Sequence, residues 1–258
     1  MIAGTAPSGE APVDVLVCTF NSAAHLTEVL EAARRCLPIH RLIVVDRHST
    51  DRTVEIATSF GAEVHVEEVG LGYARRRAVE LAETPQVLFL DSDVVIRRPD
   101  FLARARAQLA RPGTAAVVGC AVGHPFLYGL PLSLTLFDRS WILRVRIPPG
   151  VQGRETYYIQ RQVREEHRRV RYVPEAFEHF GTYRSSPHWP EWQGAWVRIT
   201  GGVSVRELLY SGLVVALLLL NSRRLRNIAY APVFYLKLVR GFMAPQRWRE
   251  MDRRRAAG

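Results

Sequence analysis

The sequence predicts an α/β fold, in which helices flank a Rossmann-like sheet, followed by a helical appendage at the C-terminus. Strand-like and helix-like patterns alternate over residues 13–90, which is typical of βα units with parallel strands. Charge also changes along the chain: residues 201–258 carry 11 Arg or Lys and 3 acidic residues, a net +8, whereas residues 1–200 carry 24 and 22, a net +2. We therefore expect a flexible N-terminus at 1–12, a folded domain at 13–200 and a basic helical region at 201–258.

The first βα unit is predicted from two adjacent patterns. Residues 13–20 (VDVLVCTF) are a β-branched run that indicates a buried strand. Apolar residues then recur at the spacing of one helix face over residues 22–36, and Pro38 follows as a stop signal. A strand followed by a helix is therefore expected at the start of the domain.

The second unit repeats this order. Residues 41–46 (RLIVVD) predict a strand, the polar residues 49–51 are typical helix caps, and Gly61 marks the end of that helix. Residues 63–67 alternate between polar and apolar side chains, so a third strand is expected there.

The third and fourth strands are joined by another helix. Residues 73–83 have a helical pattern, and residues 86–90 (QVLFL) form a buried-strand run that ends on Asp91. Further elements are expected as a helix after Pro99, a strand at 115–122, a helix at 157–167 and strands at 170–173 and 176–180. Ligands in sheets of this kind bind beyond the carboxyl ends of the strands, where Asp91 is placed.

Two carboxylates one residue apart, Asp91 and Asp93, follow the buried strand directly. Such a pair can share a hard divalent cation, Mg²⁺ or Mn²⁺, and bridge it to a diphosphate. The alternative interpretation is a turn cap or a solvated loop, which is the commoner role of an isolated Asp-x-Asp. Its position at a strand end favours the metal site.

The order of the motifs resembles the family 2 glycosyltransferases, whose fold is the GT-A fold, a mixed Rossmann-like sheet flanked by helices. The similarity covers residues 13–181. Its pieces are C-T-F-N at 18–21, V-D-R-H-S-T-D-R-T at 45–53, G-Y-A-R-R at 72–76 and L-D-S-D at 90–93. The resemblance implies an inverting, metal-dependent hexosyltransferase that uses a UDP- or GDP-sugar donor.

The resemblance also implies a role for individual residues of the donor site. Thr19, Phe20 and Asn21 would line the nucleotide pocket, and Asp46 would accept a hydrogen bond from the base or the ribose. Arg75 would face the base or the diphosphate, since a guanidinium pairs well with phosphate oxygens. Asp91 would serve both nucleotide and metal, with Asp93 as a second metal ligand. The alternatives without a binding role are a turn residue at a strand end for Asp46 and a solvated charge on a helix face for Arg75.

On the acceptor side, residues 153–157 (GRETY) resemble the family's G-x-E-D segment at a helix start. Glu155 is then the candidate general base, or else an acid that offsets the helix dipole. His179 would complete the metal site, contact the diphosphate or serve only structure. Thr156 replaces the usual Asp, and Arg47 and His48 replace the usual D-G, so a degenerate member that binds nucleotide or membrane without catalysis is the alternative.

The C-terminal region predicts membrane association. Residues 208–220 contain no charge, but thirteen residues are fewer than the ~20 of a full span. Residues 228–243 are apolar and aromatic, and Arg residues flank both stretches. We expect interfacial helices on an anionic surface, a short or re-entrant insertion being the other possibility, and a lipid-linked acceptor such as polyprenyl phosphate or a glycolipid. A helix packed on the domain, or a dimer contact, is the soluble alternative.

Several other classes are disfavoured by the sequence. The three cysteines, Cys18, Cys36 and Cys120, have no spacing of a disulfide framework or a zinc site. No apolar secretion-signal region occurs at 1–12, so the catalytic part is expected at the cytoplasmic face of the membrane, in the synthesis of an envelope glycan or glycolipid. Residues 1–200 are too nearly neutral for a nucleic-acid partner, and the first βα turn has no G-x-G-x-x-G. The sequence does not define an oligomeric state.

Overall fold

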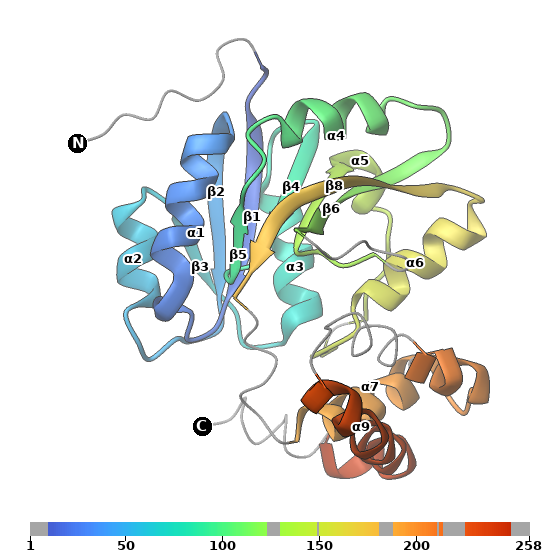
Figure 1. The fold of residues 1–258 in the computed structure, drawn as a ribbon. Helices are drawn as coiled ribbons and strands as arrows, with labels where there is room; N and C mark the ends of the chain where they lie inside the picture. Colours follow the sequence, from blue (N-terminus) through green and yellow to red (C-terminus); the bar gives the residue numbers. More distant parts are fainter. Residues whose placement is uncertain are drawn as a thin grey trace. The chain divides into compact units, whose positions relative to one another are not determined.

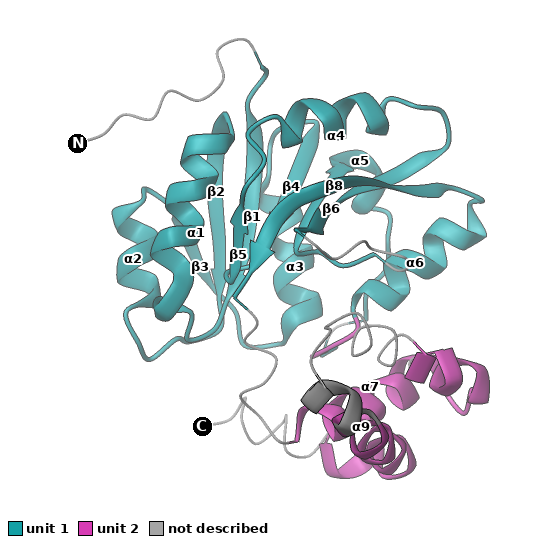
Figure 2. Cartoon of the chain, viewed as in Figure 1, with its two compact units in different colours: residues 1–151, 155–180 teal, residues 152–154, 181–258 magenta. Residues whose placement is uncertain are grey.

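The computed structural model describes residues 10–122, 130–148, 150–180, 188–210, 212–213 and 225–248. The chain divides into two compact units (Figure 2), a sheet unit of residues 1–151 and 155–180 and a helical unit of residues 152–154 and 181–258. The composition changes at residue 201, whereas the units divide at residue 181. The reason is that helix α7 (Trp189–Gly201), which precedes the change in composition, packs on helix α9 (Leu225–Met243).

The sheet unit contains an eight-stranded mixed sheet with the order β3-β2-β1-β4-β7-β6-β8-β5 (Figure 1). The strands are β1 (Val13–Thr19), β2 (Ile39–Asp46), β3 (Glu63–Val66), β4 (Gln86–Leu90), β5 (Val94–Ile96), β6 (Thr114–Ala121), β7 (Leu134–Asp138) and β8 (Arg169–His179). The first half of the sheet is parallel, because β1 pairs with β2 and β4, and β2 pairs with β3. Strand β7 reverses the direction, since it is antiparallel to both β4 and β6.

Helices cover both faces of this sheet (Figure 1). They are α1 (Ala23–Cys36), α2 (Thr53–Ser59), α3 (Leu71–Leu81), α4 (Phe101–Leu109), α5 (Arg139–Ile142) and α6 (Thr156–Glu165). One core cluster packs α1 and α4 against Val15 and Val17, and a second packs α3 and α6 against Leu16. Successive side chains of β1 thus point to opposite faces, and both faces are buried, which explains the unbroken apolar run in the sequence.

The expected elements are confirmed, with three differences in the second half of the sheet. Strand β4 has the predicted bounds, whereas β5 and β7 were not predicted. The two strands expected at 170–173 and 176–180 form one strand, β8, that continues past Pro174. Glu175 has a φ of 51°, and the register with β6 shifts between Gly119 and Ala121, so a β-bulge accommodates the proline.

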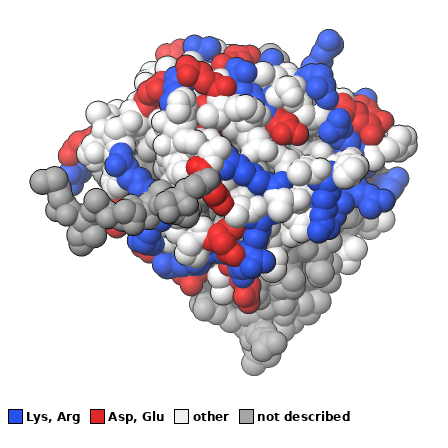
Figure 3. All heavy atoms as spheres, turned by 90° about the horizontal axis from the view of Figure 1, so that it is seen from above, with Lys and Arg blue, Asp and Glu red and all other residues white. Residues whose placement is uncertain are grey.

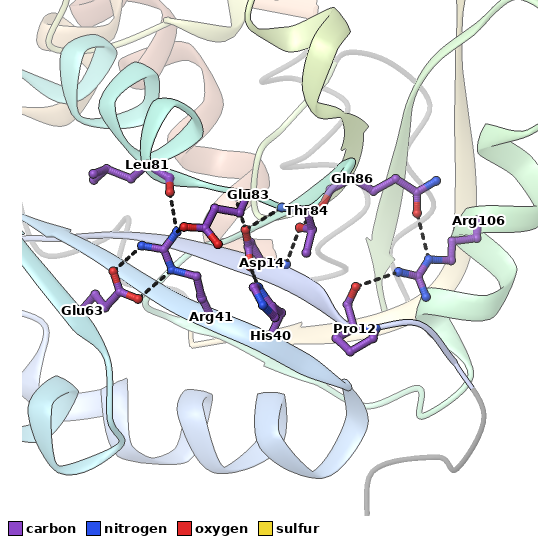
Figure 4. A network of polar contacts seen from close by, with 10 residues as sticks. All are labelled: Pro12, Asp14, His40, Arg41, Glu63, Leu81, Glu83, Thr84, Gln86 and Arg106. Atoms are coloured by element: carbon purple, nitrogen blue, oxygen red, sulfur yellow. Dashed lines mark hydrogen bonds and ion pairs between the residues drawn. The ribbon is translucent and has the colours of Figure 1, made fainter.

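A polar network ties together the amino-terminal ends of β1, β2 and β4 (Figure 4). The fully buried carboxylate of Asp14 accepts hydrogen bonds from the backbone N–H groups of Glu83 and Thr84 at 2.6 and 3.0 Å. It also lies 2.9 Å from His40 Nδ1. Burial alone would raise the pKa of Asp14, but these hydrogen bonds and His40 lower it below its usual value. The network therefore stabilises the fold while Asp14 is ionised.

Replacing Asp14 by Asn is expected to lower the free energy of unfolding by about 1–3 kcal/mol at pH 7, because the amide lacks the negative charge that the two backbone donors and His40 stabilise. Since the folded-state pKa of Asp14 is depressed, its contribution is present above pH ~4, the unfolded value, and is lost as the pH falls through the folded value. Urea unfolding between pH 7 and pH 2 measures this. Wild-type and variant should converge at low pH, and a constant difference would contradict the assignment.

Acidic and basic side chains are interspersed on the face shown in Figure 3. Many of them pair within one helix, for example Arg76 with Glu80 at 2.8 Å and Arg161 with Glu165 at 2.7 Å. This mixing agrees with the small net charge of residues 1–200.

In the helical unit, glycines allow α7 and α9 to approach closely. A Cβ atom built on Gly194 would lie 1.8 Å from the carbonyl oxygen of Leu238, and one built on Gly241 would lie 1.8 Å from that of Glu191. The two backbones are therefore in contact through this pair of glycines. Around the contact, Trp189 packs against Phe234 with ring centroids 5.5 Å apart.

The described part of the helical unit holds only a portion of the predicted membrane segments. Residues 211 and 214–220 of the apolar run lie outside the described residues, while α9 corresponds to the second stretch and contains Pro232 and Lys237. Across the described portions of the chain, every helix falls short of the length and apolar character that crossing a bilayer requires.

Candidate functional site

The candidate site lies at the carboxyl ends of β1, β2 and β4. These parallel neighbours end on Thr19, Asp46 and Leu90, so the residues that follow them meet at one edge of the sheet. The antiparallel strand β7 begins beside this edge, because Asp91 N–H donates to the carbonyl of Ser133 at 2.9 Å. The change of strand direction thus opens the edge where a ligand is expected in an α/β sheet.

Asp46 fastens the first two loops of this edge. Its carboxylate is 1% exposed and accepts hydrogen bonds from Thr19 Oγ1 at 2.6 Å, Ser49 Oγ at 2.6 Å and Ser49 N–H at 2.7 Å. The structure therefore places Thr19 and Asp46 together, but directs both side chains toward each other and toward Ser49. Asp46 is not merely a turn residue at the surface.

Phe20 and Asn21 form the exposed rim of the same edge. The Phe20 side chain is 61% exposed. Asn21 has a φ of 47°, and its Oδ1 accepts from Thr50 N–H at 2.9 Å, while its own N–H donates to Ser49 Oγ at 2.8 Å. The left-handed backbone at Asn21 turns the chain into α1, which leaves the Phe20 ring at the surface.

The two carboxylates after β4 have different neighbours. Asp91 Oδ1 accepts a 2.9 Å hydrogen bond from Arg75, whereas Asp93 Oδ1 lies 3.5 Å from His179 Nε2 at the end of β8. Ser92 between them shares a hydrogen bond of 2.9 Å with Ser22. Antiparallel pairing of β5 with β8 brings Asp93 and His179 together, and it is this pairing that joins residues far apart in the sequence.

Asp91, Asp93 and His179 supply two carboxylates and one imidazole, and the carboxylate oxygens are the ligands that suit Mn²⁺ and Mg²⁺. Asp91, Asp93 and His179 are each partly exposed, with side-chain exposures of 24%, 20% and 16%. In the described part of the chain, no three acidic, His or Cys side chains converge closely enough to enclose an ion by themselves. The pair formed by Asp93 and His179 is the nearest to a metal site.

Arg75 joins the two sides of the site. Its guanidinium donates through Nη2 to Asp91 Oδ1 at 2.9 Å and through Nε to Glu155 Oε1 at 3.0 Å. Arg75 is 6% exposed and lies over the ring of Phe89, with Cζ 5.5 Å from the ring centroid. The buried arginine is therefore no solvated helix charge, and Glu155, 4% exposed, is held beside Asp91 by way of the same guanidinium.

Helix α3 is placed so that Arg75 can reach into the site. Its start is fixed by Glu67, whose carboxylate accepts from Gly70 N–H at 2.7 Å. A Cβ atom on Gly72 would lie 2.8 Å from Ile147 and 3.1 Å from Val151, so only glycine allows this close packing. The glycine of the G-x-A-R pattern is thus explained by packing and the arginine by ion pairing.

Buried charge changes the pKa values at this edge. Burial acts to lower the pKa of Arg75, but the carboxylates of Asp91 and Glu155 outweigh it and raise that pKa above its usual value. Burial raises the pKa of the Cys18 thiol to about 12, because the nearby Arg75 only partly offsets desolvation. Arg75 is therefore fully charged and Cys18 is a neutral thiol at physiological pH.

Sequence reasoning missed the serines that hold the loops together. Ser22, Ser49 and Ser92 connect the first loop, the second loop and the Asp-x-Asp turn. Asp51 adds to this, because it accepts from Ala23 N–H at 3.1 Å and from Thr53. The only sequence signal was the cluster of helix-capping residues at 49–51, which predicts a helix start and not a contact between loops.

Solved structures of known enzymes have the same fold. The chain is similar to the mannosyltransferase of Pyrobaculum calidifontis in complex with GDP-Man and Mn²⁺, with 16% identity, a TM-score of 0.68, and 93% of this chain and 88% of that one covered. It is also similar to the glucosyl-3-phosphoglycerate synthase of Mycobacterium tuberculosis in complex with Mn²⁺, UDP and glucosyl-3-phosphoglycerate, with 20% identity, a TM-score of 0.59, and 79% and 84% covered. These likenesses confirm the GT-A fold.

No curated protein matches the sequence closely enough to be counted as a relative. The family model described as Glycosyl transferase family 2 matches residues 14–181, which is more than half of the chain and nearly all of the sheet unit. The matched span contains every residue of the site described above. The chain therefore belongs to glycosyl transferase family 2 and is a glycosyltransferase.

Proposed function

We propose that this enzyme transfers a hexose from a UDP- or GDP-sugar, with inversion and with help from Mg²⁺ or Mn²⁺, to a lipid-linked acceptor such as polyprenyl phosphate or a glycolipid. The observation that carries the proposal is one continuous polar edge. Along it, Asp93 lies beside His179, and Arg75 links Asp91 to Glu155. The aspartates and His179 would hold the cation with the donor diphosphate, and Glu155 would serve the acceptor.

The donor nucleotide belongs at the rim formed by residues 19–21. The exposed ring of Phe20 offers a face on which a base can stack, and the side-chain amide of Asn21 lies beside it. Asp46 holds this rim in shape through Thr19 and Ser49, and it would accept a hydrogen bond from the base or the ribose. The solved relatives were crystallised with UDP or GDP-Man, which supports these two bases as the first to test.

Asp91, Asp93 and His179 would hold the divalent cation. When bound, the ion neutralises negative charge on the leaving diphosphate. The complexes of the relatives with Mn²⁺ or Mg²⁺ support this role. The two carboxylates supply the oxygen ligands that these hard ions prefer.

The transfer is a single displacement at the anomeric carbon. The acceptor oxygen forms a bond to that carbon while the bond to the diphosphate oxygen breaks, and the bonding electron pair leaves with the nucleoside diphosphate. For a hydroxyl acceptor the proton passes to the carboxylate of Glu155, which the guanidinium of Arg75 joins to Asp91. A phosphate acceptor is already anionic and requires no base, and this fits Thr156 in place of a second acid.

The acceptor proposal rests on the surface of the helical unit. Exposed apolar side chains gather there on residues 203–213 and on α9: Val203, Val205, Leu209, Leu213, Val233, Leu236 and Met243. Arg206, Arg240 and Arg247 are exposed beside them. Apolar side chains flanked by arginines suit the headgroup region of an anionic membrane. We place the enzyme at the cytoplasmic face of the cell membrane, in synthesis of an envelope glycan or glycolipid.

Donor binding is tested first by the thermal unfolding of the purified protein with UDP, GDP, CDP or TDP, each with and without Mn²⁺. A rise in Tm with one nucleotide that depends on the metal is expected, because a ligand that binds only the folded state stabilises it. No rise with any of them would favour the degenerate interpretation, which the replacements Arg47, His48 and Thr156 suggest. Transfer assays with polyprenyl phosphate, glycolipid and 3-phosphoglycerate then separate lipid acceptors from the acceptor of the mycobacterial relative.

Membrane attachment predicts a specific loss of binding. Replacing the 69% exposed Leu236 by Glu should lower co-sedimentation with vesicles of anionic lipid at least about fivefold, because a carboxylate resists burial among acyl chains and is repelled by the headgroups. The matched control is Val66→Glu, at a 57% exposed apolar side chain on β3 of the sheet unit, which should bind as the wild type does. Equal binding by all three proteins would exclude α9 as the attachment surface.

A further inference from the structure

We propose that Arg75 is the positioning residue of the transfer reaction. It holds Asp91 and Glu155 through one oxygen each and so directs the second oxygen of each carboxylate toward its partner in the reaction. This inference rests on the proposed function and deepens it. It differs from the role that the family resemblance implies for Arg75, which is a contact with the base or the diphosphate.

The contacts of Arg75, Asp91 and Glu155 can be followed atom by atom. Nε of Arg75 is 3.0 Å from Glu155 Oε1, and Nη2 is 2.9 Å from Asp91 Oδ1. Within the described residues, neither Glu155 Oε2 nor Asp91 Oδ2 accepts a hydrogen bond, and neither is among the fully buried side-chain atoms that lack a partner. These two oxygens are therefore accessible, one for an acceptor proton and one for a cation.

The negative charges of Asp91 and Glu155 require a positive charge at the position of Arg75. Two carboxylates held on one buried guanidinium leave an excess of one negative charge, which a cation at Asp91 would neutralise. Without Arg75 the two acids would lose the positive charge that they share, and their carboxylates would repel each other. Arg75 Nη1 is fully buried and has no hydrogen-bond partner in the described part of the chain, so Nε and Nη2 are the two donors that make the contacts described here.

An ammonium group could not replace this fork. Arg75 uses a planar guanidinium whose Nε and Nη2 point in fixed, different directions, and its Cζ lies 5.5 Å from the centroid of the Phe89 ring. A lysine carries the same charge as a single point and has no planar group to stack. The conservative variant Arg75→Lys is therefore informative, since it separates charge from orientation.

The test is a double-mutant cycle on the full chain with Arg75→Met, Glu155→Gln and the double variant, with Arg75→Lys and Arg77→Met alongside. Arg77 is a partly exposed neighbour on the same helix and serves as the matched control. Single-turnover transfer at saturating donor gives the rate, and calorimetry with the nucleoside diphosphate and Mn²⁺ gives Kd. Thermal unfolding without ligands gives a readout that does not depend on activity.

We expect Arg75→Met and Glu155→Gln each to slow transfer at least about 100-fold, and the double variant to be no more than about threefold slower than the slower single one. Nucleotide Kd should change less than about threefold in Glu155→Gln, and Arg75→Lys should recover less than a tenth of the rate. In unfolding, Arg75→Met should lower Tm and the added Glu155→Gln should restore part of it. The double variant keeps the test usable if Arg75→Met alone folds poorly.

Two results would overturn the inference while leaving the proposed function intact. Multiplicative losses in the double variant, together with a more than tenfold weaker Kd in Arg75→Met, would make Arg75 a direct donor ligand instead. A small loss in Glu155→Gln would show that no carboxylate base needs positioning, as for a phosphate acceptor. Failure of the wild type to transfer from any donor would instead overturn the proposed function, and the inference with it.

Discussion

Replacing Asp93 by Asn is expected to slow sugar transfer at least about 1000-fold. The structure places Asp93 Oδ1 3.5 Å from Nε2 of His179, another candidate metal ligand. An amide oxygen carries no charge, so the variant loses the attraction for the cation and, with it, several kcal/mol of stabilisation of the leaving diphosphate. Steady-state rates across a Mn²⁺ titration measure the effect, and the Mn²⁺ needed for half-maximal rate should rise.

The matched control is Asp100→Asn, which changes an exposed acid that pairs with Arg104 outside the site. It should leave both the rate and the Mn²⁺ dependence unchanged. Full activity of Asp93→Asn without a change in the Mn²⁺ requirement would remove the metal assignment from this carboxylate. His179→Ala should then be examined for the same loss, because His179 lies beside Asp93 and is the other candidate metal ligand there.

Gly241→Ala is expected to disrupt the helical unit, lowering its free energy of unfolding by about 3 kcal/mol or more. The added methyl would lie 1.8 Å from the carbonyl oxygen of Glu191, so α7 and α9 must move apart. Alanine by itself favours a helix over glycine by about 1 kcal/mol, so the steric effect must exceed that gain. Urea unfolding followed by tryptophan fluorescence and amide hydrogen exchange of α7 and α9 measures the change.

Gly194→Ala tests the same contact from the other helix, because its methyl would meet the carbonyl oxygen of Leu238. Leu236→Ala is the control on α9, since that side chain is exposed. A stabilised Gly241→Ala protein would show that the helices do not approach as closely as described.

Local patterns sufficed for the first half of the fold. Strand β4 was predicted with its bounds, because its buried residues are an unbroken apolar run between polar neighbours. Helix α3 begins two residues before the predicted Tyr73, since Gly70 and the carboxylate of Glu67 form its start. Such differences are small because strand and helix periods are local properties of the sequence.

The second half depends on pairing between distant segments. β7 lies in a region without a clear period, and its position between β4 and β6 is decided by tertiary contacts. β5 is three residues long and acquires its strand geometry from β8. The two strands expected at 170–173 and 176–180 form the single strand β8, because a bulge accommodates Pro174. Strand partners of this kind follow from the whole fold and not from the local sequence.

The same limit applies to the site. The motifs predicted which residues belong to it, and the structure brings Thr19 and Asp46, and Asp91, Arg75 and Glu155, into contact. The arginine's partners could not be predicted, because Glu155 is 80 residues away from it in the chain. Ion pairs between distant residues leave no period or spacing in the sequence.

The hydrogen bonds that fasten residues 19–22 to residues 46–53 also affect how strongly a donor can be bound. Fixing the backbone of one loop residue costs about 1–2 kcal/mol of conformational entropy. Here that cost is met during folding, since Asp46, Ser49 and Asn21 already hold the two loops in place. Contacts with a nucleotide therefore contribute to aligning the sugar with its acceptor instead of ordering the protein.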